Sequence, residues 1–336
     1  MNEKLTIKDI AEYANTSKTT VSFYLNGKFD KMSESTKNRI EAVIKETNYQ
    51  PSMIARCLNA KKMKMIGVMI GDITNTFANQ IVKGIDDHLR DKQYQLIVGN
   101  SSYSFEKEQE YIKRMLSIGV DGFIIQPSVH FDKLVDLIKK EKKEVVFIDS
   151  QISSKKEKWV KTNNYEVILK TCDKLIQSGY DNYIIITADP NILSTRKERV
   201  NGFYDALKIK NKVCETLTID ENIENEKLKE ILHSKINVKE KTLIFVANCF
   251  LLPKVYVALE TFKSLIPKNI GLVGFDNTEW SSLSSPSITT IIQPAYKEGQ
   301  QAAKILIDSI EGINEEIPNQ ILPCDVNWCE STNLNL

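Results

Sequence analysis

The sequence predicts a small all-α head followed by an α/β core of two lobes, each built on a doubly wound parallel sheet. Residues 5–48 carry three short helical patterns and no strand pattern. From Met65 onward, short β-rich runs alternate with amphipathic helices, which is typical of parallel sheets covered by helices on both faces. The length of 336 residues also favours more than one domain.

The head begins with two helices separated by a tight turn. Thr6 can cap the first helix, with Asp9 three residues further on, as in a capping box. Asn15 suits the turn because asparagine tolerates the left-handed conformation. Ser17 can cap the second helix, which Asn26 would end.

The second helix has two different faces. Its inward face holds Val21, Tyr24 and Leu25. The opposite stripe combines one cation, two hydroxyls and an aromatic ring, and consists of Lys18, Thr19, Ser22 and Phe23. A third helix after Ser33 would support the first two. Residues 1–48 are therefore predicted to form a helix-turn-helix DNA-binding domain.

Residues 49–64 are predicted to form a hinge helix and linker. Pro51 suits a first helical position, but the segment has about two turns at most and would barely hold a helix alone in water. We expect this segment to order conditionally.

Residues 65–336 are predicted to form the two-lobed core. The expected strands are "MIGVMIG", "YQLIVGN", "DGFIIQP", "EVVFIDS", "NYIIITAD", "VCETLTI", "TLIFVAN" and "NIGLVGF", and the helices include 77–92, 106–118, 165–178 and 197–208. The tail, with a helix over 296–311, returns to both lobes. Lobe 1 would span about 65–161 and 291–322, and lobe 2 about 162–290 and 323–336, with a cleft between them.

Polar side chains follow the strands of this predicted core. Ligands of such sheets bind at the carboxyl ends of the strands. The residues at or near those ends include Asp72, Asn75, Phe77, Gln126, Asp149, Asn248 and Asp276. They suit a hydroxyl-rich small molecule, although strand ends are polar in many proteins without a ligand.

Charge and composition narrow the function. Residues 1–64 hold 12 Lys and Arg against 7 Asp and Glu, whereas the remaining residues hold 33 against 37. A basic head on a slightly acidic body favours nucleic acid as a partner. No apolar run approaches the roughly 18 residues of a membrane span, and "MNEKLTIKDI" does not resemble a signal peptide. We therefore expect a cytoplasmic protein without a membrane partner.

Motifs of catalysis and of metal binding are missing from the sequence. There is no HExxH, GxSxG, GxGxxG or Walker loop, and the six cysteines form no CxxC pair. The sequence predicts reduced cysteines, no metal, no cofactor and no enzymatic activity.

The order of these parts resembles the lactose-repressor (LacI/GalR) family of bacterial transcription factors from about Leu5 to about Asp325. "TIKDIAEYANTSKTTVSFYLNG" looks like the helix-turn-helix of that family, and "NYQPSMIARCLNAKK" looks like its hinge helix. "RVNGF" and "GLVGFDNTEWSSLSSPSITTIIQP" resemble its periplasmic-binding-protein-like core. The resemblance implies a repressor that binds a near-palindromic double-stranded operator as a homodimer and responds to a small effector.

The resemblance also implies roles for individual residues. The DNA-facing set is Thr6, Ser17, Lys18, Thr19, Thr20, Ser22, Phe23 and Asn26, together with the hinge residues Ala55 and Leu58. In the family, a leucine at the Leu58 position wedges between base steps; the alternative is a packing contact with Ile54. Arg199, Asp276 and Asn248 match effector-binding positions, and Asp149 and Phe77 are plausible additions.

Several alternatives remain open at this point. Arg199 and Asp276 could instead pair with each other and bind nothing. The favoured effector is a sugar or sugar acid, and the alternatives are a nucleobase or nucleoside. A transport-type sugar-binding protein would share the core but not the basic head. Whether the effector releases DNA or promotes binding is equally open.

The sequence departs from the family pattern at three positions. Phe23 stands where many members carry an arginine that can contact guanine in bidentate fashion, which predicts an altered base preference. Cys249 replaces a usual aspartate, and Pro253 stands at a helix start, so the contacts around 248–253 are in doubt.

The short tail lacks a leucine heptad, which favours a dimer over a tetramer.

Overall fold

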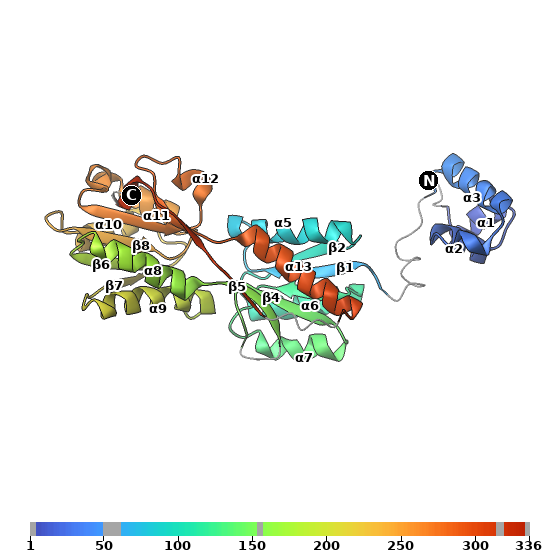
Figure 1. Cartoon of the computed structure of the whole chain (residues 1–336), viewed down its shortest axis with the longest axis horizontal. Helices are drawn as coiled ribbons and strands as arrows, with labels where there is room; N and C mark the ends of the chain where they lie inside the picture. The colour runs from blue at the N-terminus through green and yellow to red at the C-terminus, as the bar shows by residue number, and fades with distance from the viewer. Residues whose placement is uncertain (1–4, 50–61, 153–156, 314–318, 333–336) are drawn as a thin grey trace. The chain divides into compact units, whose positions relative to one another are not determined.

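The computed structural model describes residues 5–49, 62–152, 157–313 and 319–332. The chain divides into two compact units, Met1–Met63 and Lys64–Leu336, and each is considered by itself (Figure 1). The hinge residues Ala55 and Leu58 and the thiol of Cys57 lie outside the described residues. The described cysteines are free thiols, as expected.

Residues 5–49 of the head contain three helices and a short 3₁₀ turn. They are α1 (Ile7–Tyr13), α2 (Lys18–Leu25), η1 (Phe29–Lys31) and α3 (Glu34–Thr47). Their small apolar core consists of Ile10, Ala11, Ala14, Val21, Ile40 and Tyr49. Helix α2 is held between α1 and α3 by Val21, which is fully buried, so the helix-turn-helix prediction is confirmed.

The predicted caps form as expected. The Thr6 N–H and hydroxyl both donate to Asp9 Oδ2, at 2.6 and 2.7 Å. Ser17 Oγ accepts the Thr20 N–H at 3.1 Å. Asn15 adopts φ 48°, the left-handed conformation that the turn between α1 and α2 requires. These local bonds fix where α2 begins.

The described part of the core contains two six-stranded sheets. The first has the order β11-β5-β4-β3-β1-β2 and is fully parallel. Its strands are β1 (Met65–Ile70), β2 (Gln95–Asn100), β3 (Gly122–Ile125), β4 (Glu144–Ile148), β5 (Lys158–Thr162) and β11 (Gln320–Leu322). Strand β5 was absent from the expected set because its charged lysines obscure the apolar pattern.

The second sheet has the order β12-β10-β9-β8-β6-β7. Its strands are β6 (Asn182–Thr187), β7 (Glu215–Thr218), β8 (Thr242–Val246), β9 (Ile270–Phe275), β10 (Thr289–Ile292) and β12 (Asp325–Asn327). All pairs are parallel except β10 with β12, which is antiparallel. The prediction of two parallel sheets therefore holds except at this edge strand.

Helices cover both faces of each sheet. In the first lobe, α5 (Thr76–Asp91) and α13 (Ala295–Glu311) cover one face, and α6 (Phe105–Ile118) and α7 (Asp132–Lys140) cover the other. In the second lobe, α8 (Asn164–Gln177) and α9 (Ser194–Ile209) lie opposite α10 (Asn225–Lys235) and α11 (Leu252–Ala258). Shorter segments are α12 (Thr278–Ser281), η2 (Glu260–Leu265) and η3 (Glu330–Thr332). None of the helices in the described ranges is long and apolar enough to cross a membrane.

The chain passes between the two sheets three times. The passages follow β5, β10 and β11. Strand β5 ends at Thr162 and β10 at Ile292, one and two residues beyond the lobe limits expected from the sequence. The three connections lie beside one another where the lobes meet (Figure 1).

Helices α5 and α13 approach each other through two glycines. A Cβ atom on Gly84 would lie 2.0 Å from the carbonyl oxygen of Tyr296, and one on Gly299 would lie 2.1 Å from the carbonyl oxygen of Ile81. Each glycine therefore makes room for the backbone of the opposite helix. This close approach seats α13 on the first sheet and places Glu298 under the end of β4.

Candidate functional site

The outward face of α2 presents the stripe that the sequence indicated. Lys18 and Thr19 are exposed, and Ser22 and Phe23 are partly exposed. The ring of Phe23 does not belong to the apolar cluster of the head, whereas Tyr24 and Leu25 pack against it. Phe23 is thus an apolar side chain on a face that the head's own core does not cover.

Four other predicted DNA-facing residues take part in helix caps. Thr6 and Ser17 cap α1 and α2, and Thr20 Oγ1 lies 2.9 Å from Ser17 Oγ. Asn26 Nδ2 donates to the Ser22 carbonyl at 2.7 Å. Thr6 fixes the start of α1, and the other three residues fix the ends of α2; the polar atoms of all four remain at the exposed surface.

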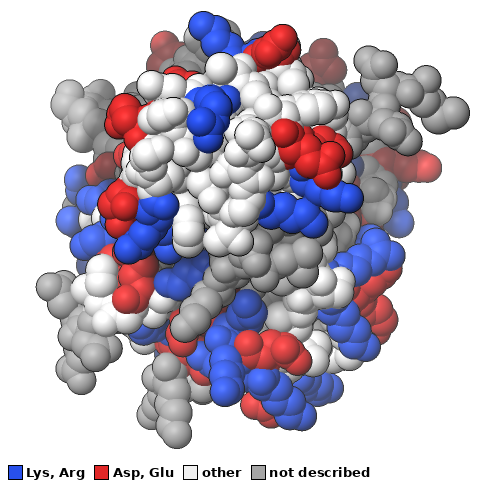
Figure 2. All heavy atoms as spheres, turned by 90° about the vertical axis from the view of Figure 1, so that its right-hand side faces the viewer, with Lys and Arg blue, Asp and Glu red and all other residues white. Residues whose placement is uncertain are grey.

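On the one face that Figure 2 shows, charge alone does not mark out a DNA-binding surface. On the face in Figure 2, Lys and Arg side chains alternate with Asp, Glu and uncharged side chains. Within residues 5–49, Lys8, Lys31 and Lys37 lie near carboxylates, whereas no ion pair of this range includes Lys18. Lys18 therefore keeps its charge available on the exposed stripe.

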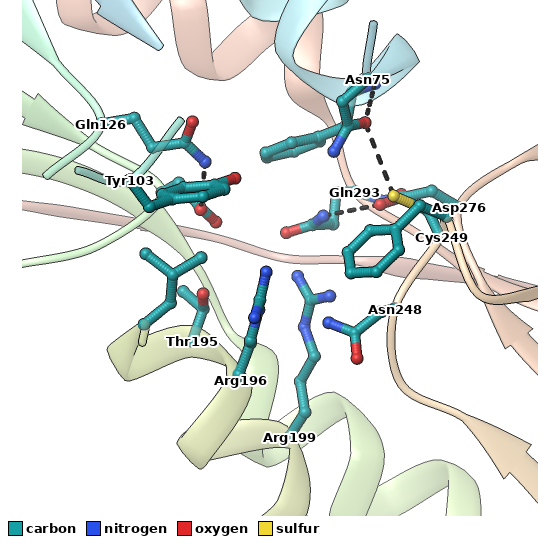
Figure 3. A pocket seen from close by; sticks show the side chains of 14 residues that line it. Asn75, Tyr103, Gln126, Thr195, Arg196, Arg199, Asn248, Cys249, Asp276 and Gln293 are labelled. Carbon is teal, nitrogen blue, oxygen red and sulfur yellow. Dashed lines mark hydrogen bonds between the residues drawn. The ribbon is translucent and has the colours of Figure 1, made fainter. Parts of the chain in front are cut away.

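The core contains a cavity where the two lobes meet. Its walls include seven of the eight predicted effector residues, namely Asn75, Phe77, Gln126, Asp149, Arg199, Asn248 and Asp276 (Figure 3). Asp72 does not line the cavity. Its Oδ1 instead accepts hydrogen bonds from the N–H and hydroxyl of Thr74, both at 2.8 Å. The Asp72 carboxylate is therefore used in a short turn after β1, although the strand-end pattern had assigned it to the effector site.

Two acidic residues of the first lobe, Asp149 in the cavity wall and Glu298 behind it, are joined by a hydrogen bond. Glu298 Oε1 accepts the Asp149 N–H at 2.5 Å, and Gln126 Nε2 donates to Asp149 Oδ2 at 2.7 Å. Burial raises the pKa of Asp149 and raises that of Glu298 further, with the neighbouring Asp149 charge as a second cause for Glu298. Asp149 Oδ1 and Glu298 Oε2 are buried, and within the described residues neither has a hydrogen-bond partner.

Asp276 occupies the corresponding place in the second lobe. Its two carboxylate oxygens accept the backbone N–H of Gln293 at 3.0 Å and the Gln293 side-chain amide at 2.7 Å. Burial raises the pKa of Asp276 to about 6, against the lowering effect of Arg199. Both Asp149 and Asp276 adopt left-handed φ values, 62° and 57°. Each aspartate thus adopts this rarely occupied backbone conformation directly after the last residue of its strand.

Arg199 is fixed by the second lobe itself. Its Nε donates to Asn164 Oδ1 at 2.7 Å, and its Nη1 donates to the Ala247 carbonyl at 2.9 Å. The guanidinium lies 3.7 Å from the centre of the Phe275 ring. The ion pairs of the described residues do not include one between Arg199 and Asp276, so the geometry does not favour the alternative that they pair only with each other.

The segment 248–253 belongs to the second lobe and contacts the first lobe through Cys249, despite its unusual sequence. Asn248 Oδ1 accepts the Ala188 N–H at 2.8 Å. The Cys249 thiol lies 3.5 Å from Asn75 Oδ1, which belongs to the first lobe. Burial raises the pKa of this thiol to about 12, so it stays protonated and donates. Pro253 falls in the first turn of α11, a position that suits proline.

The sequence did not single out six further residues of the cavity wall, namely Tyr103, Leu193, Thr195, Arg196, Phe250 and Gln293. Two of them carried a usable signal. Gln293 directly follows β10, and Arg196 precedes Arg199 by three residues on one helix face. Tyr103 lies in a loop at φ 56° and gave no periodic signal.

The central cavity is narrow and adjoins two wider ones. Its free volume is about 30 Å³, so side chains nearly fill it. Tyr103 and Arg196 also line a cavity of about 400 Å³, and Phe77, Asp276 and Gln293 also line one of about 460 Å³. A ligand larger than a few water molecules would therefore require these side chains or the lobes to move apart.

Comparison with known proteins supports this division of the chain. Residues 6–52 match the lacI family of bacterial regulatory proteins, and residues 66–314 match a periplasmic binding protein domain. The HTH-type transcriptional regulator KdgR of Bacillus subtilis is 32% identical over 311 residues, covering 91% of each chain.

Solved structures share the fold. A lac repressor dimer bound to operator and the anti-inducer ONPF has a TM-score of 0.83 at 22% identity, covering 98% of this chain and 99% of that one. A LacI family regulator of Enterococcus faecium with bound ribose has a TM-score of 0.69 at 25% identity, covering 80% and 98%. With its helix-turn-helix head, two-lobed core and KdgR relative, the chain belongs to the lacI family of bacterial regulatory proteins, which are DNA-binding transcriptional regulators and not enzymes.

Proposed function

We propose that this regulator represses transcription as a homodimer on a near-palindromic operator and that a small effector in the lobe-interface cavity changes its operator affinity. The observation that carries the proposal is the cavity itself, because polar side chains of both lobes converge there. A ligand held by both lobes favours one lobe arrangement, and any coupling of that arrangement to the head alters DNA binding. By linkage, an effector that weakens DNA binding also binds less well when DNA is present.

The effector we favour is a sugar or sugar acid. Carboxylate, amide and guanidinium groups form directional hydrogen bonds to hydroxyls, and Phe77 offers an apolar surface beside them. The similar Enterococcus faecium regulator holds ribose. A nucleobase is the second candidate. A transport-type binding protein is disfavoured because the helix-turn-helix head would have no role there.

For DNA, we propose that α2 enters the major groove. Lys18 can reach guanine acceptors, Thr19 and Ser22 can contact base edges or phosphates, and Phe23 can pack on thymine methyl groups. Thr6 and Ser17 lie at helix N-termini, which suit phosphate oxygens. Ala55 and Leu58 are proposed to act in the minor groove, and the protein to act in the cytoplasm, where its operator is accessible.

Operator binding should show a steep salt dependence. Neutralising several phosphates releases counterions, so we expect the association constant to fall about 10³-fold or more between 50 and 200 mM salt. Fluorescence anisotropy with the promoter region of its own gene measures this effect. A chain starting at Lys64, whose apolar clusters are independent of the head, should stay folded and lose operator binding. Sequence-independent binding by the full chain would refute the proposal.

Phe23→Arg is expected to change which DNA sequence is bound while leaving the stability of the head nearly unchanged. The ring is partly exposed and outside the head's core, so its replacement should alter stability by less than about 0.5 kcal/mol. Arginine would add a bidentate contact to guanine at one position of each half-site. Selection from random DNA with the wild-type protein and the variant tests this effect. Val21→Ala, which removes two methyl groups from the core of the head, is the control for loss of folding. Identical selected sites would contradict the assignment of Phe23.

A further inference from the structure

Arg196 is a buried cation that projects into the cavity from α9. It lies one helical turn before Arg199, and both side chains extend toward the space between the lobes (Figure 3). Arg196 is 6% exposed, as is Arg199. The two guanidinium groups nevertheless differ in what holds them.

Two aromatic rings from opposite lobes lie near the Arg196 guanidinium. Its central carbon lies 5.7 Å from the centre of the Tyr103 ring and 5.5 Å from that of Phe250. Cation–π contacts of this kind help to position the guanidinium and use none of its N–H donors. Tyr103 belongs to the first lobe and Phe250 to the second, so Arg196 lies between them.

The N–H edge of Arg196 is poorly satisfied by the protein. Among the hydrogen bonds of the described residues, Arg196 makes one, from Nη1 to the Asp189 carbonyl at 3.3 Å. No ion pair of the same residues includes Arg196, whereas Arg199 makes two hydrogen bonds at 2.7 and 2.9 Å. A guanidinium has five N–H donors, and leaving them unpaired when buried is costly.

We propose that Arg196 pairs with a carboxylate of the effector, so that the cavity selects an acidic carbohydrate over its neutral counterpart. This inference rests on the proposed function and specifies its ligand. The hydroxyl-bearing part of the ligand lies toward Gln126, Asn248 and Asp276, and the carboxylate lies at the Arg196 end. The planar fork of a guanidinium matches the two oxygens of a carboxylate in bidentate fashion.

The charges beyond Arg196 favour a carboxylate over a phosphate ester. Asp189, Asp220 and Glu221 line the adjoining cavity, on the far side of Tyr103 and Arg196. A dianionic phosphate would lie close to these three carboxylates and be repelled. A single planar negative charge kept at Arg196 meets less repulsion.

Binding of matched ligand pairs to the full-length protein tests the inference. The probes are glucuronate, galacturonate and gluconate, with glucuronamide, glucose and galactose as neutral counterparts and glucose 6-phosphate as the phosphate arm. Thermal shift finds the binders and calorimetry measures their affinity. We expect at least one acid to bind about 10-fold or more tightly than its neutral counterpart.

Substitutions then assign the preference to Arg196. Arg196→Gln should weaken binding of that acid about 10- to 100-fold, because a charge-assisted hydrogen bond is lost, and should remove the preference over the neutral counterpart. Arg196→Lys should give an intermediate loss, since it keeps the charge but not the planar fork. Lys197→Gln is the matched control, because it removes one charge from the exposed side of the same helix and should change nothing.

Three results would overturn the inference. They are binding of a neutral sugar or of the phosphate ester at least as tight as that of every acid, no binding of any acid, and unchanged acid binding by Arg196→Gln. Operator binding without ligand is measured for all variants in parallel. If the wild-type protein fails to bind its operator, the proposed function fails; if operator binding is intact and responds only to neutral sugars, the inference about Arg196 alone fails.

Discussion

Asp276→Asn is expected to raise the thermal stability of the core above about pH 6 while weakening effector binding about 100-fold or more. The carboxyl is buried, and its pKa in the folded protein is about 6 against the ordinary value of 3.8. An unfolded chain ionises this group freely, whereas the folded cavity resists ionisation. Ionisation of Asp276 therefore destabilises the native state, whereas the amide of an asparagine does not ionise and has no such effect.

The sign of the pH dependence follows from the raised pKa. Below about pH 4 the carboxyl is protonated in both states and costs nothing. Between about pH 4 and 6 the unfolded state loses its proton first, so the free energy of unfolding falls, by at most about 3 kcal/mol. Above pH 6 the penalty is complete. Asp149 and Glu298, whose pKa values are also raised, contribute a slope of the same sign that remains in the variant.

The gain from Asp276→Asn should be smaller than this ceiling. The carboxylate accepts two hydrogen bonds from Gln293, and an asparagine can accept from only one of these donors unless the Gln293 amide turns over. Gln293 Oε1 already accepts the Thr162 hydroxyl at 2.8 Å, which opposes that turn. We expect a net gain of about 1–2 kcal/mol, or a few degrees in Tm.

Thermal unfolding from pH 5 to 8 and calorimetry with the ligand found in the panel measure the two effects. Asp72→Asn is the matched control: the sequence placed it in the same set, but it does not line the cavity and should leave ligand binding unchanged. A variant that is less stable than the wild type at pH 7.5, or that binds the ligand equally well, would contradict the assignment of Asp276.

Gly299→Ala is expected to destabilise the core by about 2–3 kcal/mol. The added methyl would lie 2.1 Å from the Ile81 carbonyl oxygen, so α5 and α13 must separate. Overpacking of this kind usually costs about 1–3 kcal/mol, and the contact here is with backbone that cannot rotate away. Separation would also shift Glu298, the neighbour of Gly299, from the Asp149 N–H.

Thermal unfolding of Gly299→Ala should show a Tm lowered by roughly 5–10 °C. Lys304→Ala, at an exposed position of the same helix, is the control for helix propensity and should change Tm little. Alanine favours helix over glycine by about 1 kcal/mol. An unchanged or raised Tm would therefore show that the two helices accommodate the methyl group, which would contradict the close contact at Gly299.

The fold was predictable because its signals are local. The caps at Thr6, Ser17 and Ser33 and the alternation of apolar strands with amphipathic helices depend on residues close in sequence. The lysine-bearing strand β5 was not predicted, and neither was the antiparallel direction of β12, because both depend on the partner strand and not on composition. Neither strand contributes a long apolar run.

The cavity was predictable only where one rule applied. Polar residues at strand ends gave Gln126, Asp149, Asn248 and Asp276, and the same rule covers Gln293. The rule cannot tell a free carboxylate from one held by its own turn, as at Asp72. Glu298 could not be predicted as a neighbour of the cavity, because it lies within a helix and its partner Asp149 is 149 residues away in the sequence.

The threefold passage of the chain between the lobes has a consequence for synthesis on the ribosome. The strands from β1 to β5 emerge first, but α13 and β11, which belong to the same lobe, emerge only after nearly the whole second lobe. Until then the apolar side of the first sheet that α13 covers faces water or other proteins. The nascent first lobe should therefore depend on chaperones, and stop codons shortly before Ala295 should yield aggregating fragments instead of a stable half-protein.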